Sequence, residues 1–301
     1  MAPLFAAIVL TKDEAPNLPH CLKSLAGIPA EVYVVDSGSK DETLEIARAM
    51  GAHVLSNPWK NYSSQFNWAL DNIKSSAPWI LRIDADELLS PELRLALVRD
   101  LPKLAPDISG ILVRLRIYFL GRWMRHGGMY PIWLLRVWRR DTARCEDRWM
   151  DEHIILRHGS TVRLRADLIH NNRKSLASWI EKHCRYAVRE SADLLSIPSS
   201  VNALVGQARV KRWLKERLYC HLPLFLRAWM YWVLRYFLRL GFLDGKEGFA
   251  YHFFHALWYR SLVDATLCER KRAGENGDRS TNDEGRFSAQ SDIRRPPCTP
   301  S

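Results

Sequence analysis

Three carboxylates follow an apolar run in the stretch WILRIDADELLSPEL, residues 79–93. Asp84, Asp86 and Glu87 lie within four positions, at the point where the run ends. Hard cations such as Mg²⁺ and Mn²⁺ prefer oxygen ligands, keep several waters and bridge to phosphate oxygens. The pattern predicts a divalent-cation site that would anchor a diphosphate and neutralise the charge of a departing nucleoside diphosphate.

The pattern Asp84-x-Asp86 could also serve a solvated loop or a phosphatase. In the first case the carboxylates would cap the next helix. In the second, an aspartate nucleophile would usually continue as D-x-D-x-T/V, whereas position 88 is Leu. The chain contains neither G-x-x-x-x-G-K-[ST] nor G-x-G-x-x-G, so a nucleotide bound here would have to be held by carboxylates and a metal.

Apolar runs and helical patterns alternate through the first hundred residues, which predicts a mostly parallel α/β sheet covered by helices. Strands are expected at 5–11, 31–39, 52–57 and 79–87, and helices at 18–25, 39–51, 63–75 and from Ser90 onward. Ser39 and Glu42 resemble a capping box, and Ser90-Pro91-Glu92 has the features of a helix start. Thr11, Asp36 and Asp84 then all lie at the carboxyl ends of strands, where open α/β sheets bind ligands.

Charge is distributed unevenly along the 301 residues, whose net charge is +11. The first hundred contain nine Lys and Arg against 13 Asp and Glu, and the rest contain 35 against 20. An acidic first third and a basic, aromatic-rich remainder suggest two tasks, and basic surfaces favour nucleic acid or an anionic membrane. Six scattered cysteines without C-x-x-C favour reduced thiols in the cytoplasm. The apolar N-terminus lacks signal-peptide features and is interpreted as a first strand.

The segment 218–242 is apolar but is interrupted by Arg227, Arg235 and Arg239. Helical spacing would place these arginines within about a third of the circumference. A membrane-spanning helix would have to bury them, so we expect a helix that lies in the membrane interface with its arginines toward anionic lipid. The alternative is a helix packed in the core of the protein. From residue 273 onward the composition predicts disorder.

Four motifs occur in order within residues 4–100: IVLTKDEAPNLPHCLKSL, VYVVDSGSKDET, QFNWAL and WILRIDADE. Together they resemble family 2 glycosyltransferases of the GT-A fold. Further motifs, GGMYPIWLLRVWRR, WMDEHI, SWIEKHCRYA and GFLDGKEGFAYHFFHALWYR, resemble the bacterial branch that builds lipopolysaccharide core or other surface polysaccharides. That branch often has YPDWQ where this chain has Ile132 and Leu134, which weakens assignment to a particular acceptor.

The resemblance implies inverting transfer of a sugar from a nucleotide-diphosphate sugar, with UDP as the family expectation. The residues implied to bind the nucleotide-sugar are Thr11, Glu14, Asp36, Gln65, Asn67 and Asp84. Asp86 and Asp84 are the implied ligands of Mg²⁺ or Mn²⁺, with Asp86 the stronger candidate.

Inverting transfer needs a general base that deprotonates the acceptor hydroxyl. The motif MDEHI supplies Asp151 and Glu152, and Glu152 aligns with the glutamate of the related branch. Glu152 is therefore the first candidate and Asp151 the second, with Glu146 or Asp147 as the remaining alternatives. His153 is expected to be structural or to contact the acceptor. Arg136, Arg139 and Arg140 could meet a diphosphate or an anionic acceptor, or form a solvated basic strand end.

These observations predict a metal-dependent glycosyltransferase in the cytoplasm, attached peripherally to the inner face of the cell membrane. Its acceptor would be an amphiphilic glycan, either lipid-linked or a lipopolysaccharide-core intermediate, and nucleic acid is not an expected partner. We expect a GT-A domain at residues 1–172, a helical, amphipathic, membrane-associating region at 173–272 and a disordered tail at 273–301. The alternatives are a basic nucleic-acid-binding protein and a catalytically inactive membrane scaffold of the same fold.

Overall fold

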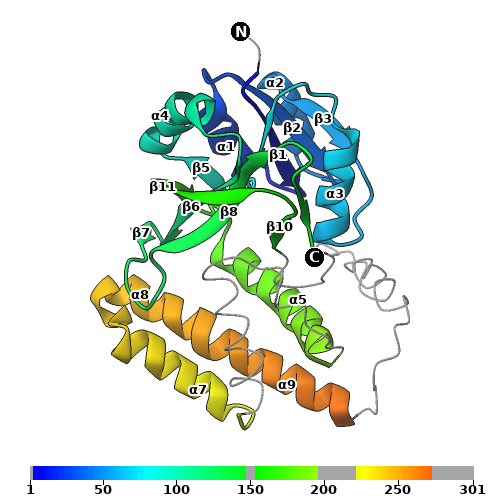
Figure 1. Cartoon of the computed structure of the whole chain (residues 1–301). Helices are drawn as coiled ribbons and strands as arrows, with labels where there is room; N and C mark the ends of the chain where they lie inside the picture. Colours follow the sequence, from blue (N-terminus) through cyan, green and yellow to red (C-terminus); the bar gives the residue numbers. More distant parts are fainter. Residues whose placement is uncertain (1–2, 147–152, 196–221, 273–301) are drawn as a thin grey trace, which may run out of the picture.

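The computed structural model describes residues 3–146, 153–195 and 222–272. A sheet with helices on both faces forms one end of the molecule and a group of helices forms the other (Figure 1). The strand order of the main sheet is β3-β2-β1-β4-β8-β6-β11-β5. The strands β3, β2, β1 and β4 are mutually parallel, while β8 runs antiparallel to both β4 and β6.

The N-terminal elements follow the predicted alternation of strands and helices. They are β1 (Phe5–Thr11), α1 (Leu18–Leu25), β2 (Ala30–Asp36), α2 (Thr43–Ala49), β3 (His53–Ser56), α3 (Tyr62–Asn72), β4 (Trp79–Arg82), β5 (Glu87–Leu89) and α4 (Pro91–Asp100), followed by the short 3-10 helix η1 (Leu101–Lys103). The Ser90 hydroxyl accepts from Leu93 N at 3.1 Å, which confirms the predicted start of α4.

Alternate residues of β1 face opposite sides of the sheet and build two cores. Phe5, Ala7 and Val9 pack with α1, α2 and α4, whereas Ala6 and Ile8 pack with α3. Strand β1 is buried on both sides, which explains why it reads as a continuous apolar run. The GT-A prediction of a Rossmann-like sheet with helices on both faces is confirmed.

The remaining strands widen the sheet, and helices complete the chain. The strands are β6 (Ile108–Phe119), β7 (Arg122–Trp123), β8 (Ile132–Arg139), β9 (Ala143–Cys145), β10 (Ile154–Leu156) and β11 (Ser160–His170). The helical part comprises α5 (Leu176–Leu195), α7 (Leu226–Val233), the π-helical η4 (Leu234–Leu238), the 3-10 helix η5 (Gly241–Asp244), α8 (Gly245–His252), the π-helical η6 (Phe253–Trp258) and α9 (Tyr259–Arg272). Within the described ranges no helix is long and apolar enough to cross a membrane.

The predicted outward orientation of the arginines in segment 218–242 is wrong for two of the three, because only Arg239 is exposed. Arg227 and Arg235 are 2% and 5% exposed and point into the protein. Arg227 is paired with Asp264 of α9, and Arg235 donates to the carbonyl of Gly127 at 2.9 Å. A charge-assisted hydrogen bond to a carboxylate or carbonyl compensates the desolvation of a buried guanidinium. Such a group would be more costly in the apolar interior of a membrane. The expected continuous helix is also interrupted, because Leu240 has φ 59° between η4 and η5.

Candidate functional site

The ends of β1 and β2 meet through their last side chains. Thr11 and Asp36 are directly opposite in the parallel register, and the Thr11 hydroxyl donates to Asp36 Oδ1 at 3.1 Å. Asp36 also accepts from the backbone N–H groups of Gly38 and Ser39, at 2.8 and 2.9 Å. The predicted convergence of these two residues at the carboxyl edge of the sheet is therefore observed.

Ser39 belongs to this cluster and does not form the predicted capping box. Its hydroxyl donates to Asp36 and accepts from Asp13 N at 2.8 Å, and α2 begins only at Thr43. Asp41, whose carboxylate accepts from Thr43 N at 3.1 Å, satisfies the helix start instead. The capping-box prediction is wrong because Ser39 is more strongly engaged by the adjacent strand end.

The carboxylates after β4 surround a buried arginine. Arg136 of β8 contacts Glu87 Oε1 at 2.5 Å and Asp84 Oδ2 at 3.3 Å. Asp84 also accepts from the Tyr62 hydroxyl of α3 at 2.9 Å, and Glu87 Oε2 accepts from Asp84 N at 3.0 Å. Arg136 therefore holds the loop between β4 and β5 through both acids, while the Asp84 side chain stays 30% exposed.

The two acids that share Arg136 have opposite pKa shifts. Burial raises the pKa of Glu87 to about 7, with Asp84 and Asp86 adding to the effect and Arg136 opposing it. Burial also opposes ionisation of Asp84, but Arg136 and Arg82 outweigh it and lower the pKa of that carboxyl. The partly exposed carboxylate of Asp84 is thus kept charged, whereas the buried carboxyl of Glu87 holds the loop through its contact with Arg136.

Asp86 contacts a histidine that was not among the predicted site residues. His170, at the end of β11, lies with Nε2 3.1 Å from Asp86 Oδ2, and Asn171 N donates to Asp86 O at 2.9 Å. Burial opposes ionisation of Asp86, but the adjacent His170 outweighs it and lowers the pKa of Asp86. The only sequence signal for His170 is its place at the end of an apolar strand. The pairing of β11 with β5 brings this strand end beside Asp86 and Glu87.

The chemistry of these side chains suits a hard divalent cation. Asp84 and Asp86 offer carboxylate oxygens and His170 an imidazole nitrogen, all three accepted by Mn²⁺. Among the described residues, however, no group of three or more His, Cys, Asp and Glu side chains is arranged to hold a metal. The residues fit a cation that completes its coordination with diphosphate oxygens and water.

Glu14 connects the loop after β1 to the segment after β11. Its carboxylate accepts from Lys174 Nζ at 2.6 Å and from Asn17 Nδ2 at 2.8 Å. Asn17 in turn accepts from Arg173 N at 2.7 Å. The structure therefore places Glu14 between two segments that border the strand ends.

Gln65 and Asn67 of α3 use their amides to hold other segments. Gln65 is 1% exposed and exchanges two hydrogen bonds with Asn57, at 2.7 and 3.1 Å. Asn67 donates to Cys145 O at 2.9 Å and accepts from Cys145 N at 3.0 Å, so that it binds β9 to α3.

Asp151 and Glu152, like Asp147, lie outside the described residues. The flanking strands β9 and β10 pair antiparallel, and Glu146 N donates to His153 O at 3.0 Å. Glu146 also accepts from His153 N through its side chain at 2.8 Å. Helix α3 therefore makes two contacts. Through Tyr62 it contacts the loop that carries Asp84, and through Asn67 it contacts β9, the strand that precedes Glu152 in the sequence.

Arg139 and Arg140 lie away from the carboxylates. Arg139 donates to Ile108 O at 2.8 Å, and Arg140 donates to Ala77 O at 3.0 Å. Of the three arginines on this strand and at its end, Arg136 is the one that contacts the acidic loop.

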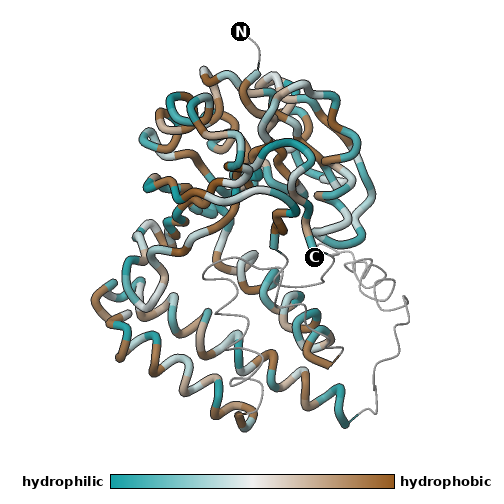
Figure 2. Tube along the Cα trace, in the orientation of Figure 1, coloured by the Kyte–Doolittle hydropathy of each residue, from teal (hydrophilic) through white to brown (hydrophobic). Residues whose placement is uncertain are grey.

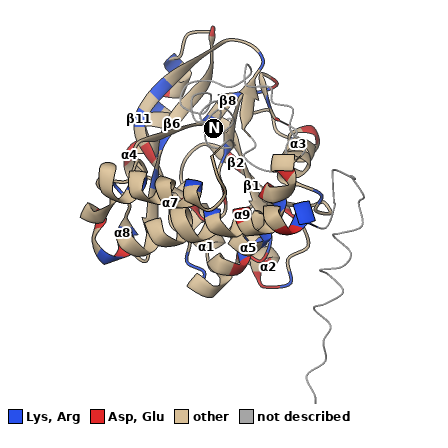
Figure 3. Ribbon diagram, turned by 90° about the horizontal axis from the view of Figure 1, so that it is seen from below, with Lys and Arg blue, Asp and Glu red and all other residues tan. Residues whose placement is uncertain are grey.

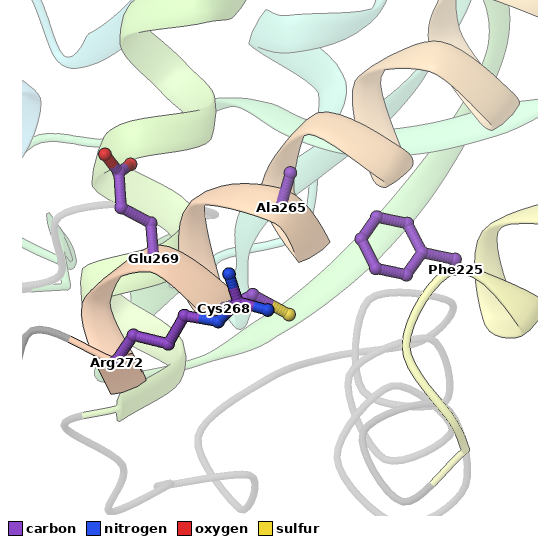
Figure 4. A pocket seen from close by; sticks show the side chains of 5 residues that line it. All are labelled: Phe225, Ala265, Cys268, Glu269 and Arg272. Atoms are coloured by element: carbon purple, nitrogen blue, oxygen red, sulfur yellow. The ribbon is translucent and has the colours of Figure 1, made fainter.

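A hollow of about 570 Å³ lies elsewhere, between Phe225 and α9 (Figure 4). Ala265, Cys268, Glu269 and Arg272 line its other side. With a single carboxylate and a largely apolar lining, it does not fit a diphosphate with a cation. The strand ends that carry Asp36, Asp84 and Asp86 fit that ligand better.

Comparisons with known proteins relate the chain to glycosyltransferases. An uncharacterized glycosyltransferase of Rickettsia bellii is 44% identical over 89 residues, 30% of each chain. The lipopolysaccharide core biosynthesis glycosyltransferase LpsC of Rhizobium meliloti is 36% identical over 124 residues, 40% of this chain and 44% of that protein. The matches thus span less than half the length of these curated relatives.

Among solved structures, a mannosyltransferase of Pyrobaculum calidifontis aligns with 97% of this chain and 80% of its own, at 14% identity and a TM-score of 0.44. The family model described as glycosyl transferase family 2 matches residues 6–169. This match covers more than half of the chain and includes the strand ends with Thr11, Asp36, Asp84 and Asp86. The chain therefore belongs to glycosyl transferase family 2.

Proposed function

We propose that this protein is an inverting, metal-dependent glycosyltransferase that moves a sugar from a UDP-sugar to a lipid-linked or lipopolysaccharide-core acceptor. The observation that carries the proposal is the position of Asp36, Asp84 and Asp86 at or just after the carboxyl ends of β2 and β4, which both pair with β1, within the region that matches the family. The relative that acts in lipopolysaccharide core biosynthesis supports the choice of acceptor.

The donor would lie along that edge of the sheet. Thr11, Glu14 and Asp36 would bind the nucleoside, with Asp36 at the base, and Gln65 and Asn67 would border the sugar. Asp86 and Asp84 would hold Mg²⁺ or Mn²⁺, which when bound neutralises charge on the diphosphate. His170 is the neighbour available to orient Asp86 or to join it as a ligand.

In the transfer step Glu152 would accept the proton of the acceptor hydroxyl. The hydroxyl oxygen forms a bond to the anomeric carbon while the bond from that carbon to the diphosphate oxygen breaks, and the nucleoside diphosphate leaves with the electron pair. Asp151 is the alternative base. The reaction would occur in the cytoplasm at the inner face of the cell membrane, where an amphiphilic acceptor is presented.

The first test is calorimetric titration with UDP, with and without Mn²⁺, of the wild type, Asp86→Ala and Glu152→Gln. We expect metal-dependent binding by the wild type, its loss in Asp86→Ala, and unchanged binding without sugar transfer in Glu152→Gln. Removing a general base is expected to lower turnover about 10²–10⁴-fold.

Absence of metal-dependent UDP binding by the wild type would contradict the choice of nucleotide, and other nucleoside diphosphates would be titrated next. Near-normal turnover of Glu152→Gln would exclude it as the base and favour Asp151.

A further inference from the structure

The exposed large apolar side chains of the described chain are concentrated in one segment. Most of them lie between residues 225 and 253, from the residue before α7 to the first residue of η6. We call this surface the outer apolar face and define it by Phe225, Trp229, Phe237, Leu238, Leu243 and Phe249, which are between 48% and 73% exposed. In Figure 3, which views the molecule from the helical end, the ribbons of α7 and α8 are mostly uncharged. The rings of Phe242 and Phe249 both contact Tyr236, which links η5 and α8 to η4. Large exposed apolar surface marks a site of interaction.

The inward arginines fix which side of α7 and η4 faces outward. Arg227 is paired with Asp264, whose other oxygen accepts from Phe225 N at 2.7 Å. Arg235 is held by Gly127 O and by the Tyr231 hydroxyl at 3.0 Å. Because the polar side of the segment is used for these internal contacts, Trp229, Phe237 and Leu238 face away from the protein.

The exposed charges beside this surface are positive. Between residues 222 and 253 the exposed charged side chains are Arg239 and Lys246, the latter 92% exposed. Asp244 is buried against His126, at 2.6 Å, and Glu247 is 18% exposed and lies 3.7 Å from Arg122. The two acids of the segment are therefore covered or paired. Lys246 Nζ lies 3.9 Å from Glu247 Oε1, but its side chain is 92% exposed, and such solvent-exposed pairs are weak. Lys246 and the exposed Arg239 therefore reach solvent, where they can meet an anionic partner.

We propose that the outer apolar face docks on an anionic lipid bilayer, with the aromatic and leucine side chains in the headgroup region and Arg239 and Lys246 at lipid phosphates. Aromatic side chains favour the membrane interface, and basic residues near anionic lipids add attraction. A second copy of this chain is a poorer occupant, because a two-fold pairing would bring the same cations toward one another.

Hydropathy along the chain places apolar residues in the same part of the molecule. Figure 2 shows apolar stretches on the helices at the end of the molecule opposite the sheet. The inference adds a docking surface to the proposed function, and it rests on that function only in supposing that the acceptor resides in the membrane. With α7 and α8 at the bilayer, the carboxyl ends of the strands would remain accessible to a donor from solution.

The test is co-sedimentation of the full-length protein with vesicles, either of phosphatidylcholine alone or with about a quarter phosphatidylglycerol. Leu238→Asp introduces a charge at a side chain that is 73% exposed. Leu95→Asp, on α4 and 72% exposed, is the matched control. We expect partition onto anionic vesicles to fall about tenfold or more in Leu238→Asp and to stay unchanged in Leu95→Asp.

A second pair tests the charges. Lys246→Glu should weaken binding to anionic vesicles about fivefold while leaving the weak binding to phosphatidylcholine unchanged, and Lys103→Glu, exposed on η1, should do neither. All variants are also titrated with UDP and Mn²⁺, so a failure to bind vesicles is distinguishable from a failure to bind nucleotide.

Equal vesicle binding by Leu238→Asp and the wild type, or no binding by the wild type, would overturn the proposal. A dimer of the lipid-free protein that Leu238→Asp dissociates, seen by sedimentation velocity, would instead assign the face to a second copy.

Discussion

Arg136 shows how one buried side chain organises the acidic loop. It is 5% exposed and contacts both Glu87 and Asp84, and in the described structure its Nε and Nη1 atoms have no hydrogen-bond partner. Removing one partner of a buried ion pair destabilises a protein strongly, because the remaining charge is buried without compensation. The same cation lowers the pKa of Asp84 and so keeps that carboxylate charged.

Arg136→Met is expected to lower the free energy of unfolding by about 3–5 kcal/mol near pH 8. The loss should be smaller near pH 6, because Glu87, whose pKa is already raised to about 7, can then take up a proton and become neutral. Arg99→Met breaks an exposed pair with Asp100 and should cost less than about 1 kcal/mol. Urea denaturation at both pH values measures the difference, and equal losses for the two variants would contradict the role given to Arg136.

Helix α3 is the element that links the two halves of the candidate site. It begins at Tyr62, which binds Asp84, and five residues later Asn67 holds Cys145 of β9. Five residues of α-helix rise about 7.5 Å, so both contacts lie on the first two turns. The position of β9, the strand that precedes Asp151 and Glu152 in the sequence, therefore depends on this helix.

Asn67→Ala removes both hydrogen bonds to Cys145, so we expect turnover to fall about tenfold or more while the affinity for UDP changes little. Asn72→Ala, which removes one bond to Trp68 O at the exposed end of the same helix, is the control and should leave turnover unchanged. Steady-state kinetics together with UDP titration separates the two effects. Weakened UDP binding in Asn67→Ala would contradict this role, because it would indicate that Asn67 contacts the nucleotide itself.

At the scale of the whole molecule, two histidines of the helical part, His252 and His255, have lowered pKa values. His252 is fully buried, lies close to Gly127 and Gly241, and has no hydrogen-bond partner at either ring nitrogen within the described residues. Burial, reinforced by Arg235, lowers the pKa of His252 to about 4. Burial also lowers the pKa of His255, with Arg235 and Arg260 contributing. Both side chains are therefore neutral in the folded protein.

These shifts predict acid sensitivity. A histidine whose pKa is lower in the folded than in the unfolded state contributes stability that is present above about pH 6.5 and is lost as the pH falls toward 4. The free energy of unfolding should fall in that window by up to about 1.4 kcal/mol per pH unit for each histidine. His255→Gln should flatten the dependence, whereas His158→Gln, at an exposed position, should leave it unchanged. Denaturation curves across this range check the slope, and an identical slope in His255→Gln would rule out its contribution.

The sequence by itself determined the alternation of strands and helices, the strand ends at Thr11, Asp36 and Asp84, and the family, because local periodicity and closely spaced motifs carry that information. Only the tertiary structure decided which distant residues meet those ends. His170 reaches Asp86 through the pairing of β11 with β5, and Arg136 reaches Glu87 through β8. The tertiary structure also reversed the expected orientation of Arg227 and Arg235. Helical spacing predicts which side chains share a face of the helix, but it does not determine whether that face meets lipid or an acid such as Asp264.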